Sequence, residues 1–214
     1  PVWHPKMWQA IFTKNRQLAS KAFDYGVHKS AWADIANAAE ENNEPGKFTT
    51  FIGYEFTAGT EVEGGNLHRN VIFESSKAPI RPWSREDSLN PMELWAWMDK
   101  LRAKGLDSIA IPHNSNGSNG EMFEVETYYG TPIDLTYSET RMRNEPIVEI
   151  TQVKGTSDTH PLLSPDDAWA DFEIMDGRVG ARPPTYSYPA GGYVRDAYLS
   201  CLLYTSDAAD EQQR

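Results

Sequence analysis

The sequence predicts an α/β fold with mostly parallel strands and long loops. Segments rich in β-branched and aromatic residues alternate with helical segments along the chain. One helix is followed directly by a short apolar strand, which is typical of a strand–helix–strand unit with two parallel strands. The stretches 114–145 and 155–198 are mostly polar and are predicted to be loops.

Three helices are predicted. The first covers residues 6–22, where apolar residues recur at an imperfect helical spacing. The second covers residues 31–43, with Ser30 as its N-cap and a Pro-Gly pair beyond its end. The third, residues 91–104, has the clearest boundaries, because Asn90 can cap it, a proline fills its first position and a glycine follows it.

Four strands are predicted. The segment 47–57 is rich in β-branched and aromatic residues and lies between glycines, and the segment 68–74 has a similar composition. The short run 108–112 follows the third helix directly, and the mostly apolar segment 146–153 is predicted to be a buried strand.

The composition indicates one globular domain and argues against two classes of partner. The chain has 214 residues, of which 39% are hydrophobic and 12% aromatic. A net charge of −11 argues against binding a nucleic-acid backbone, which requires a basic face. No run of about 18 apolar residues is present, so no membrane span is expected. The partner expected is a small-molecule substrate.

Three residues that could bind a metal ion lie at predicted strand ends. Glu55 is near the end of the first strand, His68 begins the second, and His113 directly follows the third. In parallel α/β folds the C-terminal strand ends form the active-site face. Carboxylate and imidazole groups are ligands that zinc, manganese and iron prefer. The alternative is that both histidines form ordinary loop hydrogen bonds and Glu55 is a solvated edge residue.

Several long segments resemble the bacterial family called domain of unknown function 3604. These segments are KFTTFIGYEFT, GGNLHRNVIF, NPMELWAWMDKLRAKGLDSIAIPHNSNGSNGEMF, RNEPIVEITQVKGTSDTHPLLSP and GGYVRDA. That family is in turn similar to the polymerase and histidinol phosphatase (PHP) superfamily of metal-dependent phosphoesterases. The resemblance covers nearly all of residues 31–198 and implies a fragment of a PHP-like distorted (βα)-barrel.

The resemblance also implies a ligand set and cofactors. Glu55, in a Gly-x-Glu context, matches a glutamate ligand of the superfamily, and His68 and His113 match its next two histidine ligands. The implied cofactors are divalent ions, namely zinc, manganese or iron, with two or three in the full-length protein. The implied activity is that of a metal-dependent hydrolase, with a phosphate ester as substrate.

Two further residues are candidates for a catalytic role. His160, in a Thr-His-Pro context that the family shares, could bind substrate or a metal, or it could only fix a loop. Arg69 could hold a substrate anion through its forked donors, or it could pair with Glu74 or Glu55. Glu149 alternates with apolar residues in the last predicted strand, so it is expected to be buried and to need a partner, namely Lys154, Arg69 or a histidine near the metal ligands.

The resemblance predicts that residues 1–199 are the middle portion of one PHP-like domain, which is expected to be inactive alone. Its other ligand motifs are expected to precede Pro1 and to follow residue 199. Residues 200–214 resemble a translated sequencing adapter and are predicted to be an artefactual tail. Two alternatives remain open: a non-catalytic carbohydrate- or ligand-binding module, which seven Trp and ten Tyr would suit, and a non-functional gene fragment.

Overall fold

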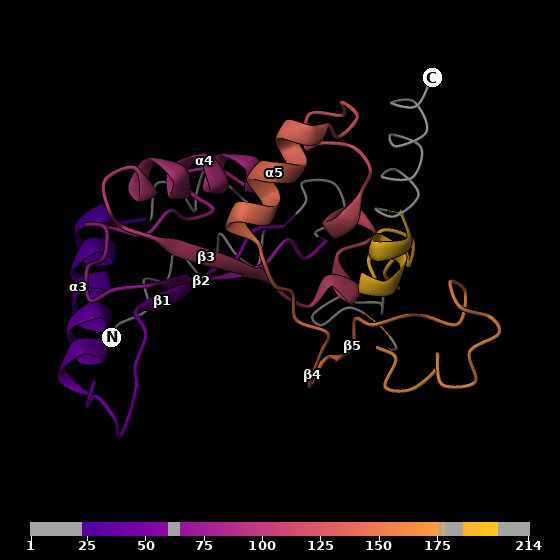
Figure 1. Ribbon diagram of the computed structural model, residues 1–214, viewed down its shortest axis with the longest axis horizontal. Helices are drawn as coiled ribbons and strands as arrows, with labels where there is room; N and C mark the ends of the chain where they lie inside the picture. The colour runs from indigo at the N-terminus through magenta and orange to yellow at the C-terminus, as the bar shows by residue number, and fades with distance from the viewer. Residues whose placement is uncertain (1–22, 60–64, 176, 178–185, 201–214) are drawn as a thin grey trace. The chain divides into compact units, whose positions relative to one another are not determined.

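The structure is a computed structural model of the chain (Figure 1). It describes residues 23–59, 65–175, 177 and 186–200. The chain divides into two compact units, Pro1–Ile52 with Ser75–Pro82 and Gly53–Glu74 with Trp83–Arg214. The predicted helix 6–22 and residues 201–214 of the predicted tail lie outside the described residues.

The first unit contains helix α3, Tyr25–Glu41. This helix begins earlier than predicted, because the side chain of Asp24 rather than that of Ser30 accepts hydrogen bonds from the N–H groups of the first turn. Trp32 is the buried residue of α3, and its indole N–H donates to the carbonyl of Pro79 over 2.7 Å. This hydrogen bond ties α3 to the segment 75–82 of the same unit.

The second unit is built on a three-stranded sheet in the order β1-β2-β3 (Figure 1). Its strands are β1 (Gly53–Phe56), β2 (Arg69–Phe73) and β3 (Ser108–Pro112), and both pairings are antiparallel. A second, two-stranded antiparallel sheet consists of β4 (Thr151–Gln152) and β5 (Gly155–Thr156). The predicted parallel, PHP-like (βα)-barrel is therefore wrong, because the described residues form short antiparallel sheets and no closed barrel.

The strand directions have a local explanation. A short connection between neighbouring strands favours an antiparallel pair, and only the segment 57–68 separates β1 from β2. Between β2 and β3 the helix does lie where it was predicted. However, the long irregular segment 74–90 precedes that helix, so the chain can re-enter the sheet in either direction. A helix between two strands therefore does not by itself establish a parallel crossover.

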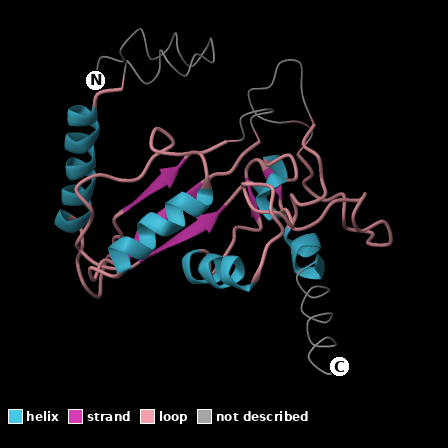
Figure 2. Cartoon of the chain, turned by 90° about the horizontal axis from the view of Figure 1, so that it is seen from above, coloured by secondary structure: helices cyan, strands magenta, loops and turns pink. Residues whose placement is uncertain are grey.

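Helix α4, Pro91–Arg102, confirms the clearest sequence prediction and covers the sheet. Asn90 caps it by accepting a hydrogen bond from the backbone N–H of Met92 over 2.9 Å. Its buried residues include Leu94, Trp95 and Met98, and seen from above the helix lies across the β1–β3 sheet (Figure 2). The core of this unit therefore lies between α4 and the sheet, and Trp95 belongs to it.

The structure differs from the sequence prediction in two places: it has a helix where a loop was predicted, and it lacks most of a predicted strand. Helix α5, Leu135–Asn144, lies within a predicted loop, and Asp134 caps it with a hydrogen bond from the N–H of Tyr137. Its few apolar residues give no helical stripe from which to predict it. The predicted buried strand 146–153 is wrong, since Ile147 and Ile150 are each about half exposed and only β4 is extended there.

The backbone of Gly191 lies very close to the backbone of Gly120, and we expect Gly191→Ala to destabilise the protein. Its φ is +77°, and a Cβ atom there would overlap the carbonyl oxygen of Gly120. Left-handed strain costs about 1–2 kcal/mol for a residue with a Cβ, and the overlap adds to that cost. Gly105→Ala is the matched control, because Gly105 has φ +78° and open space around its Cβ position. Urea unfolding should show a larger loss of unfolding free energy for Gly191→Ala than for Gly105→Ala. Equal losses in the two variants would contradict the close contact between Gly191 and Gly120.

Candidate metal centre

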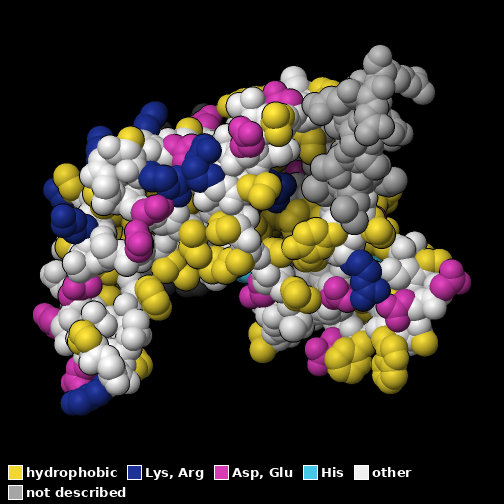
Figure 3. Space-filling model, in the orientation of Figure 1, with side chains coloured by type: hydrophobic (Ala, Val, Ile, Leu, Met, Phe, Trp, Pro, Cys, Tyr) yellow, Lys and Arg dark blue, Asp and Glu magenta, His cyan; other side chains and the backbone are white. Residues whose placement is uncertain are grey.

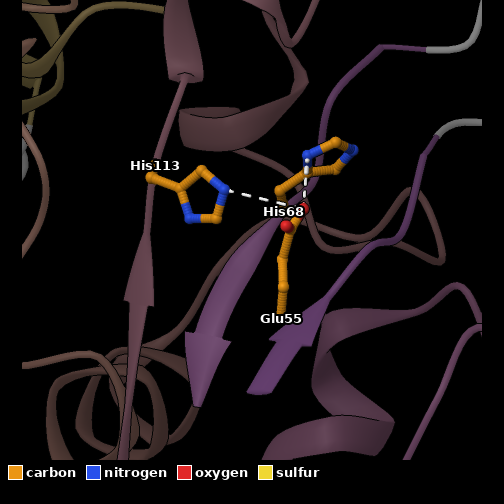
Figure 4. Close-up of side chains that lie close together, drawn as sticks. All are labelled: Glu55, His68 and His113. Atoms are coloured by element: carbon orange, nitrogen blue, oxygen red, sulfur yellow. Dashed lines mark ion pairs between the residues drawn. The ribbon is translucent and has the colours of Figure 1, made fainter. Parts of the chain in front are cut away.

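One edge of the three-stranded sheet brings the predicted metal ligands together (Figure 4). Because the strands are antiparallel, the end of β1 and the end of β3 both lie opposite the start of β2. Glu55 is near the end of β1, His68 directly precedes β2 and His113 directly follows β3. The three side chains point toward one another from three different strands (Figure 4).

The donor atoms of this group lie at distances that suit one metal ion. His68 Nδ1 is 3.0 Å and His113 Nε2 is 3.8 Å from Glu55 Oε1. All three donor atoms lie within 4.8 Å of one another. Ligand bonds of 2.0–2.1 Å in tetrahedral geometry would separate donor atoms by about 3.4 Å, so only small side-chain movements are required.

The buried nitrogen of His68 has no hydrogen-bond partner among the described residues. Its 3.0 Å approach to Glu55 lacks the geometry of a hydrogen bond, although the two atoms are close. Buried polar atoms are nearly always satisfied, so such an atom requires an explanation. Two imidazoles and a carboxylate form a donor set of the kind that holds zinc, manganese or iron, and an ion would satisfy this nitrogen.

The electrostatic environment keeps His68 neutral near pH 7. Burial, and to a lesser extent the charges of His113, Lys154 and Arg69, lower the pKa of His68 to about 4, although the carboxylate of Glu55 opposes the shift. A neutral imidazole has a lone pair available for a metal ion. The side chains of His68 and His113 are 18% and 8% exposed, whereas that of Glu55 is 44% exposed. The group is therefore open to solvent on the side of Glu55.

Backbone contacts fix the loop that carries His113. The N–H of His113 donates to the carbonyl of His68 over 3.3 Å, which joins the two histidines directly. Asn114 has a left-handed backbone, with φ 56°, and its N–H donates to Glu149 Oε1 over 3.3 Å. Glu149 also accepts a hydrogen bond from the amide of Gln152 over 2.7 Å. The observed partners of Glu149 are therefore an amide and a backbone N–H next to His113, and not the expected Lys154, Arg69 or histidine.

Arg69 lies in a buried ion pair. Its Nε donates to Glu145 Oε1 over 2.7 Å, and its Nη1 donates to the carbonyl of Leu67 over 2.6 Å. Glu145 also accepts hydrogen bonds from the indole of Trp95 and from Arg141. Burial opposes ionisation of Glu145, but Arg69 and Arg141 outweigh it and hold its pKa below the usual range. Arg69 therefore forms a salt bridge, but with Glu145 and not with Glu74 or Glu55, and its catalytic role stays a prediction.

His160 is not in the three-residue group and instead lines a cleft of about 810 Å³. The side chains of Tyr186, Tyr188 and Tyr193 line the same cleft. The Nδ1 atom of His160 accepts a hydrogen bond from the N–H of Leu162 over 3.1 Å, so the neutral ring carries its proton on Nε2. Burial lowers the pKa of His160, which favours this neutral form.

Charged side chains of both signs are mixed on the described surface seen in Figure 3. On the face seen in Figure 3, Lys and Arg side chains are dispersed among Asp, Glu and hydrophobic side chains, without one continuous basic patch in its described part. The expectation that nucleic acid is not a partner stays a prediction. Within the described residues, no helix has the length and apolar character that a membrane crossing needs, in agreement with the sequence.

Comparison with known proteins identifies the family of the chain. The family model described as "Protein of unknown function (DUF3604)" matches residues 4–210. No curated protein and no solved structure matches the chain. The similarity to the PHP superfamily and the artefactual origin of residues 200–214 therefore stay predictions. The match extends over nearly the whole sequence, and the chain belongs to the DUF3604 family.

Proposed function

We propose that the protein is a metal-dependent hydrolase of phosphate esters, with a divalent ion held by Glu55, His68 and His113. The observation that supports the proposal is the convergence of these three donor groups at one sheet edge. The phosphate ester as substrate comes from the resemblance to the PHP superfamily. The donor set suits zinc, manganese or iron.

The exposure of the three residues supports a catalytic centre rather than a structural one. Structural zinc sites are closed by four protein ligands, whereas catalytic sites have three and leave a position open. Glu55 is the most exposed of the three ligands, so the open position would face solvent on its side. A bound divalent ion supplies an activated water and neutralises charge on phosphoryl oxygens.

The residues around the group would hold its geometry. The hydrogen bond from His113 to the His68 carbonyl links two of the ligands, and Arg69 binds the carbonyl of Leu67, which precedes His68. Three donors suffice for one ion. The two or three ions that the resemblance implies would require ligands beyond this group, and they remain a prediction for the full-length protein.

The proposal is tested by metal-dependent hydrolysis of p-nitrophenyl phosphate. Protein stripped of metal with EDTA is reloaded with zinc, manganese or iron, and p-nitrophenol release is followed by absorbance. Because the chain is predicted to be the middle portion of a domain, the 214-residue chain is compared with a form extended at both ends. We expect hydrolysis by the extended form only after reloading. Metal-loaded protein of both forms without phosphatase activity would contradict the proposal.

The cleft that contains His160 favours a second candidate function, that of a carbohydrate- or ligand-binding module. The exposed rings of Tyr186 and Tyr188 offer stacking surfaces, and the Nε2–H of His160 offers a hydrogen-bond donor. Trp95 does not contribute to such a surface, because it is buried in the core. A binding module should retain its ligand in His113→Ala, whereas a hydrolase should lose metal and activity together.

A further inference from the structure

The backbone turns sharply directly after His113. Asn114 has a left-handed backbone, with φ 56° and ψ 39°, and it is 1% exposed. Such a conformation costs on the order of 1 kcal/mol outside glycine, and it persists only where the surrounding structure holds it. The turn leads from His113 into the short helix η1, Ser115–Gly117. The direction of the His113 side chain therefore depends on the contacts that hold this turn.

One residue, Glu149, contacts the chain on both sides of His113. The backbone N–H of Glu149 donates to the carbonyl of Pro112 over 3.0 Å, and its Oε1 accepts from the N–H of Asn114 over 3.3 Å. The side-chain amide of Gln152 donates to the same oxygen over 2.7 Å, which fixes the carboxylate in place. The residues before and after His113 are thus both bonded to Glu149, one through its backbone and one through its side chain.

The carboxylate of Glu149 acts as a hydrogen-bond acceptor and not as the partner of a cation. Within the described part of the chain it forms no ion pair, and its side chain is partly buried. A carboxylate in such a position needs hydrogen bonds from the protein, and the two N–H donors supply them. An uncharged side chain with an oxygen in the same place could therefore accept the same bonds.

Further hydrogen bonds hold the segment that carries Glu149 against the loop after His113. The side-chain amide of Asn116 donates to the carbonyl of Lys154 over 3.1 Å, and the N–H of Asn116 donates to Ser157 Oγ over 3.2 Å. These bonds do not involve the Glu149 side chain. Truncating that side chain should therefore release the N–H of Asn114 while the segment 149–157 stays attached.

We propose that Glu149 is a positioning residue of the candidate metal centre, whose carboxylate holds the turn at Asn114 and thereby the imidazole of His113. Because the N–H of His113 donates to the carbonyl of His68 over 3.3 Å, a displaced His113 would also disturb the second histidine. Partners outside a ligand set typically contribute about 10- to 100-fold in metal affinity. The inference rests on the proposed function and deepens it, because it assigns a role to a residue outside the group of three ligands.

The test measures zinc affinity by competition with a chromophoric chelator. We expect Glu149→Ala to weaken zinc binding about 10- to 100-fold. Glu149→Gln should retain most of the affinity, because its amide oxygen can accept the same two hydrogen bonds. Asp134→Ala is the matched control. It also removes a carboxylate that accepts a backbone N–H, that of Tyr137 in α5, and it should leave zinc affinity unchanged.

Two further readouts separate positioning from a general loss of stability. The visible spectrum at saturating cobalt(II) reports ligand geometry in the folded protein. Amide hydrogen exchange of His113 in metal-free protein reports its bond to the His68 carbonyl. An altered spectrum and faster exchange in Glu149→Ala, both restored in Glu149→Gln, would support the inference.

The inference and the proposed function fail in different ways. Zinc affinity, cobalt spectrum and His113 exchange in Glu149→Ala equal to those of the unaltered protein would overturn the inference. If the unaltered protein binds neither zinc nor cobalt, the proposed function fails. Exchange of the His113 amide in the metal-free variants then still decides whether Glu149 positions His113.

Discussion

Replacing His113 by alanine is expected to abolish stoichiometric metal binding. His113 supplies one of three donor atoms, and its side chain is 8% exposed, so water cannot readily replace the imidazole in the same position. Losing a partner outside the ligand set already lowers metal affinity about 10- to 100-fold, and losing a ligand should exceed that. The measurement is plasma mass spectrometry of zinc, manganese and iron after extensive dialysis.

His160→Ala is the matched control for this experiment. It removes the same side chain from a position outside the three-residue group, and it should leave metal content unchanged. Circular dichroism of both variants shows whether each remains folded. A metal-free unaltered protein, or equal metal content in the unaltered protein and in His113→Ala, would contradict the candidate metal centre.

Glu145→Ala is expected to cause the largest loss of stability. The carboxylate is 2% exposed and accepts hydrogen bonds from Arg69, Arg141 and the indole of Trp95. Its removal leaves the buried guanidinium of Arg69, also 2% exposed, without a counter-charge. Breaking a buried pair from one side typically costs about 3–5 kcal/mol, and urea-induced unfolding measures this loss.

Two variants determine whether the effect depends on burial and charge. Glu44→Ala removes a carboxylate that pairs with Lys47 at the surface, where the side chains are 63% and 80% exposed. This exposed pair is expected to contribute less than about 1 kcal/mol. Glu145→Gln retains most of the side-chain volume and one acceptor oxygen. Its loss of unfolding free energy should therefore be smaller than that of Glu145→Ala. A Glu145→Ala loss as small as that of Glu44→Ala would be incompatible with a buried ion pair.

The sequence predicted the members of the candidate metal centre, but for a reason that is partly wrong. In a parallel sheet the start of the second strand, with His68, would lie at the opposite edge from Glu55 and His113. The antiparallel pairing reverses the central strand and places all three residues at one edge. Strand ends can be located from local composition, whereas the direction of each strand depends on contacts between distant segments.

Other features could not be predicted, because they depend on such contacts. Arg69 and Glu145 are 76 positions apart, and Glu145 follows a polar helix that has no hydrophobic stripe. The hydrogen bond from the side-chain amide of Asn116 to the carbonyl of Lys154 likewise joins residues 38 positions apart. By contrast, α4 and β3 were predictable, since a cap, a proline and an apolar strand lie next to one another in the chain.

The meeting of three strand ends at one point has a consequence for folding as well as for chemistry. A slip of one residue between two strands would turn Glu55 to the other face of the sheet, and the donor group would no longer form. An ion bound there would connect all three strands and would select the native alignment over its slipped alternatives. At a free concentration 100 times its dissociation constant, such an ion would add about 2.7 kcal/mol to the stability of a short sheet.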